Sequence, residues 1–261
     1  MNAVQVKELA SFLHDAEMNK QEVTRITAEH PDLSVSEAYQ IQEELVAMKT
    51  ELGHRIIGPK MGLTSRAKMV QMKVEEPIYG YVFDYMMLSE GEALKLDELI
   101  HPKVEAEIAF ILGKDLEGPG ITAEDVMAAT EYVAPALEII DSRYENFQFT
   151  LPDVIADNAS SSRVILSNRF TKPDGIELDL VGVTLYINSE LKELGAGAAV
   201  VGHPANSVAM LANMLARKHE KLKAGEVILT GGVTGAVMLT EGDTVTAKWD
   251  GLGELQFRVT R

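Results

Sequence analysis

The chain has 261 residues, and its 24 basic and 40 acidic side chains give a net charge of −16. With 46% hydrophobic residues it can bury a large core, and without cysteine it excludes disulfides, a cysteine nucleophile and thiolate metal sites. The acidity argues against nucleic acid, and because the chain lacks a signal-peptide pattern and any apolar run of roughly 18 residues, we expect a cytoplasmic protein away from membranes.

The first fifty residues are predicted to be helical. Apolar side chains over 6–18 lie at helical spacing, and Ser34 with Glu37 forms an S-x-x-E capping box before a second periodic stretch over 35–52. No chemistry-bearing motif occurs here. We therefore predict a helical N-terminal segment over 1–54 and a catalytic domain over 55–261, joined in one compact unit.

From residue 55 onward, short β-like runs separated by glycines dominate. The predicted strands and apolar runs lie at 56–58, 79–83, 104–112, 132–140, 183–187, 227–230, 245–249 and 255–259. Helices are predicted at 66–72 after Ser65, from Thr122 through 129, and over 206–219. Because strands and helices do not alternate regularly, the pattern favours an α+β fold over a doubly wound sheet.

Two glutamates stand close together in the predicted strand over 104–112. Residues two apart on a strand share a face, so the carboxylates of Glu105 and Glu107 project together. At about 5 Å and an effective dielectric near 20, two such charges repel by roughly 3 kcal/mol. A buried pair must therefore take up a proton or hold a cation. The alternative is an edge strand with both glutamates in solvent, but the neighbouring residues on both faces are apolar.

Glu138 interrupts another apolar run, at 133–140. A glutamate in such surroundings is either paired, with Arg143 or Lys103 as candidates, or a metal ligand. Carboxylates without cysteine or clustered histidines suit a hard cation, magnesium or manganese rather than zinc.

Lys60 is the cationic counterpart of these carboxylates. It lies at the end of a β-like run, before a glycine-containing turn over 61–65. Free backbone N–H groups at such a turn can bind a carboxylate. The alternative is a surface lysine beside an ordinary turn.

Four motifs together resemble the hydratase/decarboxylase family of the fumarylacetoacetase-like fold. They are G-P-K-M-G-L-T-S at 58–65, E-A-E at 105–107, D-N-A-S at 157–160 and G-E-V-I-L-T-G at 225–231. Members act on 2-oxo acids in the meta-cleavage degradation of aromatic compounds. The resemblance, which runs from about Tyr39 to the C-terminus, implies a mixed β-roll or barrel with the helical segment packed alongside.

The resemblance also implies an active site. Magnesium, or manganese, would be held by Glu105, Glu107 and Glu138, and Lys60 would be the catalytic residue. The residues implied to bind the substrate are Gly62, Leu63, Thr64, Ile78 and Ser160.

Ile78 separates two branches of the family. Hydratases carry an acidic residue in a P-D-F/Y-G motif, whereas this chain has P-I-Y-G at 77–80. A hydratase must activate water, for which a carboxylate base is useful. A decarboxylase has no water to activate, and a fixed negative charge would repel the carboxylate that departs. The chain therefore resembles the decarboxylase branch, which converts 2-oxo-3-hexenedioate (4-oxalocrotonate) into 2-hydroxypenta-2,4-dienoate and CO2.

Two alternatives remain open at this point. One is a hydratase of the same family, and the other is a catalytically idle subunit that stabilises a hydratase partner. The three glutamates and Lys60 are all present, which argues against an idle subunit. We expect a homo-oligomer that binds a small 2-oxo dicarboxylic acid and forms a complex with the hydratase of the pathway.

Overall fold

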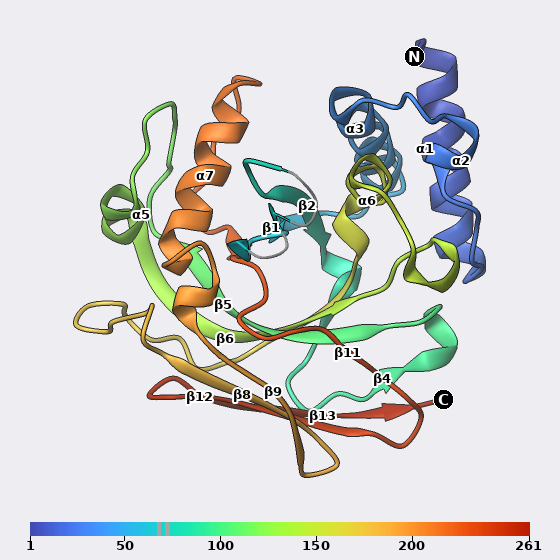
Figure 1. Ribbon diagram of the computed structural model, residues 1–261. Helices are drawn as coiled ribbons and strands as arrows, with labels where there is room; N and C mark the ends of the chain where they lie inside the picture. Colours follow the sequence, from blue (N-terminus) through green and yellow to red (C-terminus); the bar gives the residue numbers. More distant parts are fainter. Residues whose placement is uncertain (67–68, 71–73) are drawn as a thin grey trace.

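The computed structural model describes residues 1–66, 69–70 and 74–261, so the helix predicted over 66–72 lies largely outside the described residues. A strongly curved sheet occupies the centre, in the order β2-β1-β10-β5-β6-β7-β3 with β11 paired to β5 (Figure 1). Its strands are β1 (Ile56–Gly62), β2 (Ile78–Phe83), β3 (Met87–Leu88), β5 (Lys103–Leu112), β6 (Thr130–Ile140), β7 (Ser161–Leu166), β10 (Val227–Leu229) and β11 (Val237–Met238). The pairs β1–β10 and β3–β7 are parallel and the others antiparallel, which confirms the predicted mixed sheet.

A second sheet lies beneath the curved one in Figure 1. It runs in the order β4 (Leu94–Lys95), β13 (Gly253–Thr260), β12 (Thr244–Trp249), β8 (Gly182–Ile187) and β9 (Glu190–Ala196). Residues of β8, β12 and β13 alternate between buried and more exposed positions, so these strands have one face in the core. By contrast, most residues of β5 and an unbroken run over 133–139 in β6 are buried. The strand that carries Glu105 and Glu107 is thus covered on both faces, as the sequence predicted.

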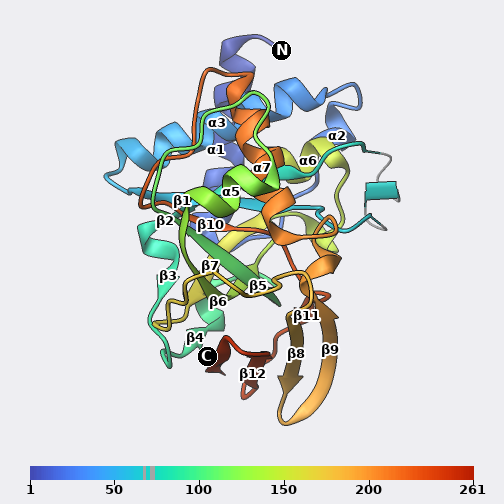
Figure 2. The same cartoon turned by 90° about the vertical axis from the view of Figure 1, so that its left-hand side faces the viewer.

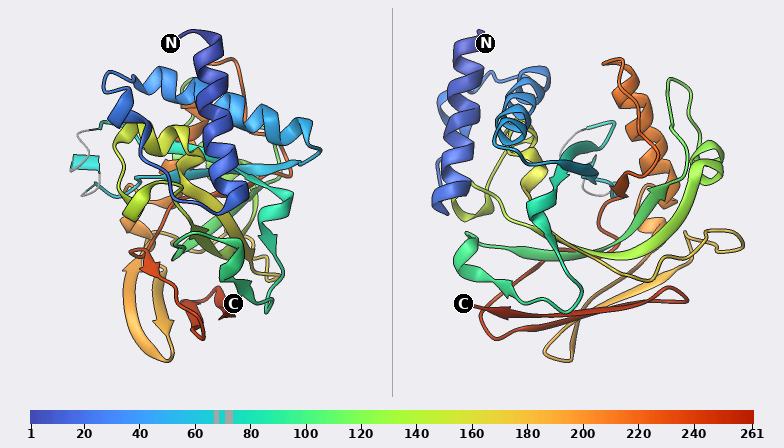
Figure 3. Two further views of the ribbon diagram at one scale, coloured as in Figure 1. Left: turned by 90° about the vertical axis from the view of Figure 1, so that its right-hand side faces the viewer. Right: turned by 180° about the vertical axis from the view of Figure 1, so that it is seen from behind.

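Helices cover the two flanks of the curved sheet. On one flank lie α1 (Ala3–Asn19), α2 (Ile26–Glu29), α3 (Val35–Glu51) and α6 (Leu151–Ala156), and on the other α5 (Ala123–Ala129) and α7 (Pro204–Ala216) (Figures 2 and 3). The capping box of Ser34 and Glu37 is present at the start of α3. The helix predicted over 206–219 begins earlier because the His203 ring caps it, accepting a hydrogen bond from the backbone N–H of Ala205 at 3.0 Å. None of the described helices is long and apolar enough to cross a membrane.

The N-terminal helices are joined to the rest of the chain by a shared hydrophobic cluster. Leu13 and Ile41 belong to one cluster with Ile78, Tyr144 and Ile155. The predicted boundary between residues 54 and 55 falls between α3 and β1, and the division into two domains stays a prediction.

A buried ion pair connects α1 to α3. The carboxylate of Glu17 lies 2.6 Å from Lys49 Nζ and accepts a hydrogen bond from the Tyr85 hydroxyl at 2.8 Å. Burial alone would raise the pKa of Glu17, but the charges of Lys49 and Arg143 and these hydrogen bonds lower the pKa to about 2. The ionised carboxylate therefore stabilises the folded state.

We expect Glu17→Gln to destabilise the fold in a pH-dependent manner. A pKa of about 2 in the folded state, below the ordinary 4.5, means that Glu17 stabilises the fold fully above pH 4.5 and loses this effect as the pH falls toward 2. The variant should lower the free energy of unfolding by up to about 3 kcal/mol at pH 7. Denaturant unfolding across this pH range measures the difference, with Glu8→Gln on the exposed face of α1 as control. A difference that does not shrink in acid would contradict this role.

Candidate metal centre and active site

Strand register brings the three predicted metal ligands together. Glu105 on β5 lies directly opposite Glu138 on β6, and Glu107 follows on the same face of β5. One carboxylate oxygen from each residue lies within 4.8 Å of the others. Glu107 and Glu138 have no exposed surface and Glu105 is 7% exposed. Because β5 lies between β10 and β6, the alternative of an edge strand with solvated glutamates is wrong.

The electrostatics of this triad are unfavourable without a cation. Burial and the charges of Glu138 and Glu105 raise the pKa of Glu107 well above its ordinary value. Burial also raises the pKa of Glu138 to about 7, although Lys60 opposes the increase. Within the described part of the chain, Glu107 Oε1 and Glu138 Oε2 accept no hydrogen bond. Buried oxygens without partners require an explanation, and three converging carboxylates fit a divalent cation with a preference for oxygen ligands.

Lys60 is the buried partner of Glu138. Its Nζ lies 3.0 Å from Glu138 Oε1 and donates a hydrogen bond to the carbonyl oxygen of Ala159 at 3.0 Å. Burial alone would lower the pKa of Lys60, but the three glutamates outweigh it and raise the pKa. Arg143, one of the two predicted candidates for pairing with Glu138, pairs with Asp157 instead, and the alternative of a surface lysine at position 60 is wrong.

A loop after β10 encloses the other side of the triad. The backbone N–H of Gly231 donates to Glu107 Oε2 at 2.8 Å, and Val233 N–H donates to the Ala106 carbonyl at 2.8 Å. A Cβ on Gly232 would lie 2.5 Å from Glu105 Oε2, so only glycine lets the backbone pass this close to the carboxylate. Sequence reasoning recognised the motif that ends at Gly231 but missed Gly232.

A cavity of about 410 Å³ opens beside Lys60 and Glu105. Four of the predicted substrate-binding residues line it, namely Gly62, Leu63, Ile78 and Ser160. The lining is completed by Lys103, Ile140, Phe147, Phe149, Val154, Ala159 and Ala236. A larger hollow of about 960 Å³ lies against the second sheet, near Lys248 and Trp249, and is lined by none of the triad. The smaller cavity is the candidate active site because it adjoins the carboxylate triad.

Thr64 differs from the other predicted substrate-binding residues. Its side chain is buried, and its carbonyl oxygen accepts a hydrogen bond from the N–H of Val201 at 3.0 Å. It is not among the residues that line the cavity. Thr64 is therefore a buried residue that does not line the cavity, unlike the other four predicted substrate-binding residues.

A left-handed turn forms another wall of the cavity. Asn158, Ala159 and Ser160 have φ angles of 49°, 51° and 56°, which is costly for residues other than glycine. The turn aims the Ala159 carbonyl at Lys60, and Ser160 Oγ is buried without a partner among the described residues. A Cβ on Gly80 would lie 2.5 Å from the Asn158 carbonyl oxygen, so β2 must have glycine at this point. The D-N-A-S motif was the sequence signal for this turn, but sequence reasoning did not predict the role of Ala159.

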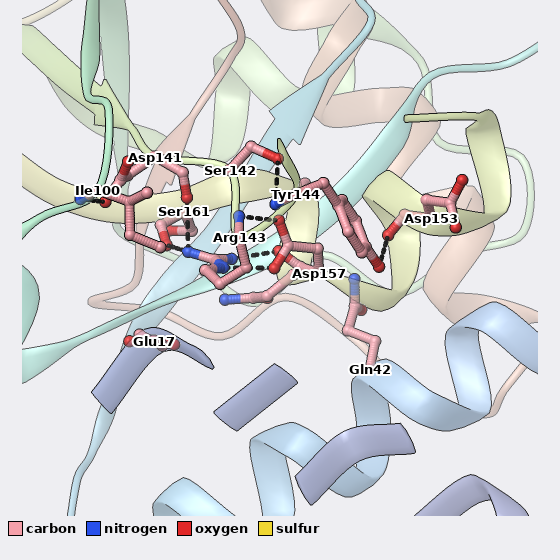
Figure 4. A network of polar contacts seen from close by, with 12 residues as sticks. Glu17, Gln42, Ile100, Asp141, Ser142, Arg143, Tyr144, Asp153, Asp157 and Ser161 are labelled. Atoms are coloured by element: carbon pink, nitrogen blue, oxygen red, sulfur yellow. Dashed lines mark hydrogen bonds and ion pairs between the residues drawn. The ribbon is translucent and has the colours of Figure 1, made fainter. Parts of the chain in front are cut away.

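Arg143 connects the left-handed turn at Asn158–Ser160 to the end of β6 through hydrogen bonds and an ion pair (Figure 4). Its guanidinium pairs with the Asp157 carboxylate and donates to the carbonyl oxygens of Asp157, Asp141 and Ser161. The side chain is 2% exposed. Burial alone would lower the pKa of Arg143, but the charges of Asp157 and Glu17 and the hydrogen bond with Asp157 together raise it above its ordinary value. Because Asp157 directly precedes the turn, the network holds the strained backbone in place.

The curved mixed sheet brings three buried carboxylates into one cluster, an arrangement that suits a divalent cation. The family model described as Fumarylacetoacetate (FAA) hydrolase C-terminal matches residues 61–260, and the chain belongs to this family. The predicted family and fold are therefore confirmed.

Two kinds of enzyme occur among the relatives. A 4-oxalocrotonate decarboxylase of Pseudomonas putida is 48% identical over 258 residues, which cover 99% of this chain and 98% of the relative. A 2-oxo-hept-4-ene-1,7-dioate hydratase of Escherichia coli is 38% identical, with 96% of each chain covered. The solved structure of 4-oxalocrotonate decarboxylase from Pseudomonas putida G7, complexed with magnesium and adipate, has a TM-score of 0.97 and 46% identity, and covers 99% of this chain and 98% of that one. The 48% identity to this decarboxylase, against 38% to this hydratase, together with the solved decarboxylase structure, confirms the predicted resemblance to the decarboxylase branch.

Proposed function

We propose that this chain is a metal-dependent carboxy-lyase that converts 2-oxo-3-hexenedioate into 2-hydroxypenta-2,4-dienoate and CO2. The observation that carries the proposal is the buried triad of Glu105, Glu107 and Glu138, set beside Lys60 in the wall of a cavity that also contains Ile78. Two Pseudomonas relatives that are 48% and 46% identical bear the name of this decarboxylase. One solved relative was complexed with magnesium and with adipate, a dicarboxylate like the proposed substrate.

The three glutamates would hold magnesium, with manganese as the second candidate. When bound, the ion supplies a Lewis acid for the negative charge that develops on the 2-oxo oxygen, an effect worth several kcal/mol. The bond to the departing carboxylate breaks, CO2 leaves, and the electron pair of that bond is delocalised along the enone to the 2-oxygen, which then takes up a proton from solvent to give the 2-hydroxy group of the product.

The chain's own residues orient and stabilise the substrate. Lys60 keeps its ammonium at the cavity wall through Glu138 and the Ala159 carbonyl, where it would stabilise the anionic substrate and the developing negative charge. Gly62 and Leu63 would bind the substrate beside it, and the Ser160 hydroxyl offers a further hydrogen bond. Ile78 gives the site an apolar wall, which favours the loss of a solvated carboxylate charge.

Product analysis tests this proposal directly. The purified chain, incubated with 2-oxo-3-hexenedioate, should release CO2 with magnesium and release none after chelation. It should not hydrate 2-hydroxypenta-2,4-dienoate appreciably. Efficient hydration of the dienoate with the hexenedioate untouched would identify a hydratase, and inactivity toward both compounds would identify an idle subunit.

We expect Ile78→Asp to depress decarboxylation at least tenfold. Two negative charges at about 4 Å repel by roughly 4 kcal/mol at an effective dielectric of 20, so a carboxylate here would oppose binding of the substrate dianion. Ile78→Asn is the matched control, since it has the same shape and polarity without the charge. The rate of CO2 release at steady state is measured for both variants. Equal rates for Ile78→Asp and Ile78→Asn would contradict the electrostatic argument. Hydratase activity need not appear, because one base does not position a water molecule.

We also propose that the chain forms a homo-oligomer and associates with the hydratase that consumes its product. A 2-hydroxypent-2,4-dienoate hydratase of Pseudomonas putida is 41% identical to this chain, which supports a shared ancestry with that partner. Light scattering of the chain, alone and mixed with the hydratase, measures both associations. The expected cytoplasmic location stays a prediction.

A further inference from the structure

We propose that Lys103 binds the distal carboxylate of the substrate and thereby selects 2-oxo dicarboxylates over 2-oxo monocarboxylates. The inference rests on the proposed function, because it takes the metal-binding triad as the anchor for the 2-oxo acid end. It adds a second anchor point at the other end of the same cavity, which Lys103 lines.

Lys103 has the correct position along β5 for this role. Alternate residues of a strand share a face, so Lys103, Glu105 and Glu107 form one row. On the neighbouring strand, Ile140 lies opposite Lys103 just as Glu138 lies opposite Glu105, and Ile140 also lines the cavity. Two residues along a strand span about 7 Å, and the carbon chain of an extended six-carbon dicarboxylate spans about 6 Å. A substrate bound at the triad can therefore reach Lys103.

A strained aromatic residue holds the Lys103 ammonium at this point. Its Nζ lies 3.9 Å from the ring centroid of Phe147, within the range of a cation–π interaction. Asn146 and Phe147 have φ angles of 55° and 58°, and a bulky side chain is uncommon in this left-handed region. The Phe147 ring lies 5.9 Å from that of Phe149, which also lines the cavity. The strained backbone thus places an aromatic wall beside a half-buried cation.

The charges of the cavity require such a cation. Among the described residues that line it, the cationic side chains are those of Lys60 and Lys103, and Lys60 is already engaged by Glu138. Glu105 and the net charge of −16 would repel a dianion. A metal ion and Lys60 can balance the charge at the 2-oxo end, and Lys103, two residues from Glu105 on β5, contributes positive charge at the other end of the cavity.

The proposal predicts an effect on binding rather than on rate. The contact with Lys103 is made to a carboxylate that is present in the bound substrate and lost during the reaction. Such an interaction stabilises the ground state, so its removal should raise KM without lowering kcat. We expect Lys103→Met, which keeps the length of the side chain, to raise KM about tenfold or more and to leave kcat unchanged or raised, so that kcat/KM falls by no more than KM rises.

A pair of substrate analogues isolates the distal carboxylate. 2-Oxoadipate and 2-oxohexanoate have the same length and the same 2-oxo acid end, but only the first carries a second carboxylate. Calorimetry with the magnesium-loaded protein should show that the wild type prefers 2-oxoadipate about tenfold or more. Lys103→Met should lose this preference while its affinity for 2-oxohexanoate stays within about threefold of wild type, which shows that the site is intact.

Two further variants serve as controls. Lys103→Arg should retain the preference because it keeps the cation, and Lys172→Met should retain it because Lys172 is exposed and does not line the cavity. If Lys103→Met prefers 2-oxoadipate over 2-oxohexanoate as strongly as the wild type does, the inference is wrong. That result would not affect the proposed function, which is tested by CO2 release from the wild type. If the proposed function itself fails, the wild type will show neither a preference for 2-oxoadipate nor CO2 release from 2-oxo-3-hexenedioate.

Discussion

Glu107→Gln should abolish turnover and weaken magnesium binding strongly, and chelation should do the same to the wild type. The carboxylate of Glu107 is fully buried beside Glu105 and Glu138, and one of its oxygens has no partner among the described residues. A neutral amide of the same shape removes one negative charge from the ligand set. Isothermal titration with magnesium measures the change, and wild-type affinity in the variant would rule out Glu107 as a ligand.

The same variant should leave the fold intact. Burial and the two neighbouring glutamates raise the pKa of Glu107 well above its ordinary value, which shows that a charge at this position is unfavourable in the metal-free protein, and glutamine carries none. We therefore expect the metal-free variant to be at least as stable as the metal-free wild type at pH 7, since an uncompensated buried charge is costly. Glu131→Gln, at an exposed position on β6, is a control that should change neither metal affinity nor stability.

Lys60→Met should lower kcat on the order of 100- to 1000-fold, the usual effect of losing one preorganised donor to a developing negative charge. The ammonium of Lys60 is 2% exposed and is oriented by two contacts, with Glu138 and with the Ala159 carbonyl. Methionine keeps the length of the side chain and removes only the charge and the donor. Steady-state CO2 release at saturating substrate measures the effect.

The metal must be saturating in this experiment, because Lys60 also acts on the ligand set. Its charge opposes the rise in the pKa of Glu138, so its loss would raise that pKa further and favour protonation over metal binding. Measurement across a magnesium titration separates weaker metal binding from loss of catalysis. Activity above about a third of wild type at saturating magnesium would contradict a catalytic role for Lys60.

Local patterns in the sequence determined much of the fold. The capping box of Ser34 and the periodic apolar residues that follow it predicted α3, and the helix start at Thr122 predicted α5, because helix starts depend on neighbours three or four residues away. Alternation along one strand likewise predicted that Glu105 and Glu107 share a face. The short strands β3, β4 and β11 were missed, since two-residue strands carry no periodicity of their own.

The sequence by itself also determined the composition of the candidate site. Buried carboxylates without cysteine indicated a hard divalent cation, and the family resemblance added Lys60 and Ser160. Both kinds of evidence depend on residue type and on short motifs, which can be read without knowing how distant segments pair.

Only the tertiary structure decided which side chains meet. Glu138 faces Glu105 through the register of β5 with β6, and it pairs with Lys60 rather than with Arg143, its near neighbour in sequence. Tertiary packing also determines the left-handed turn at Asn158–Ser160. It likewise places the Lys103 ammonium over the Phe147 ring. Such contacts join residues far apart in the chain, so they follow from sheet order and strand register, which no local spacing encodes.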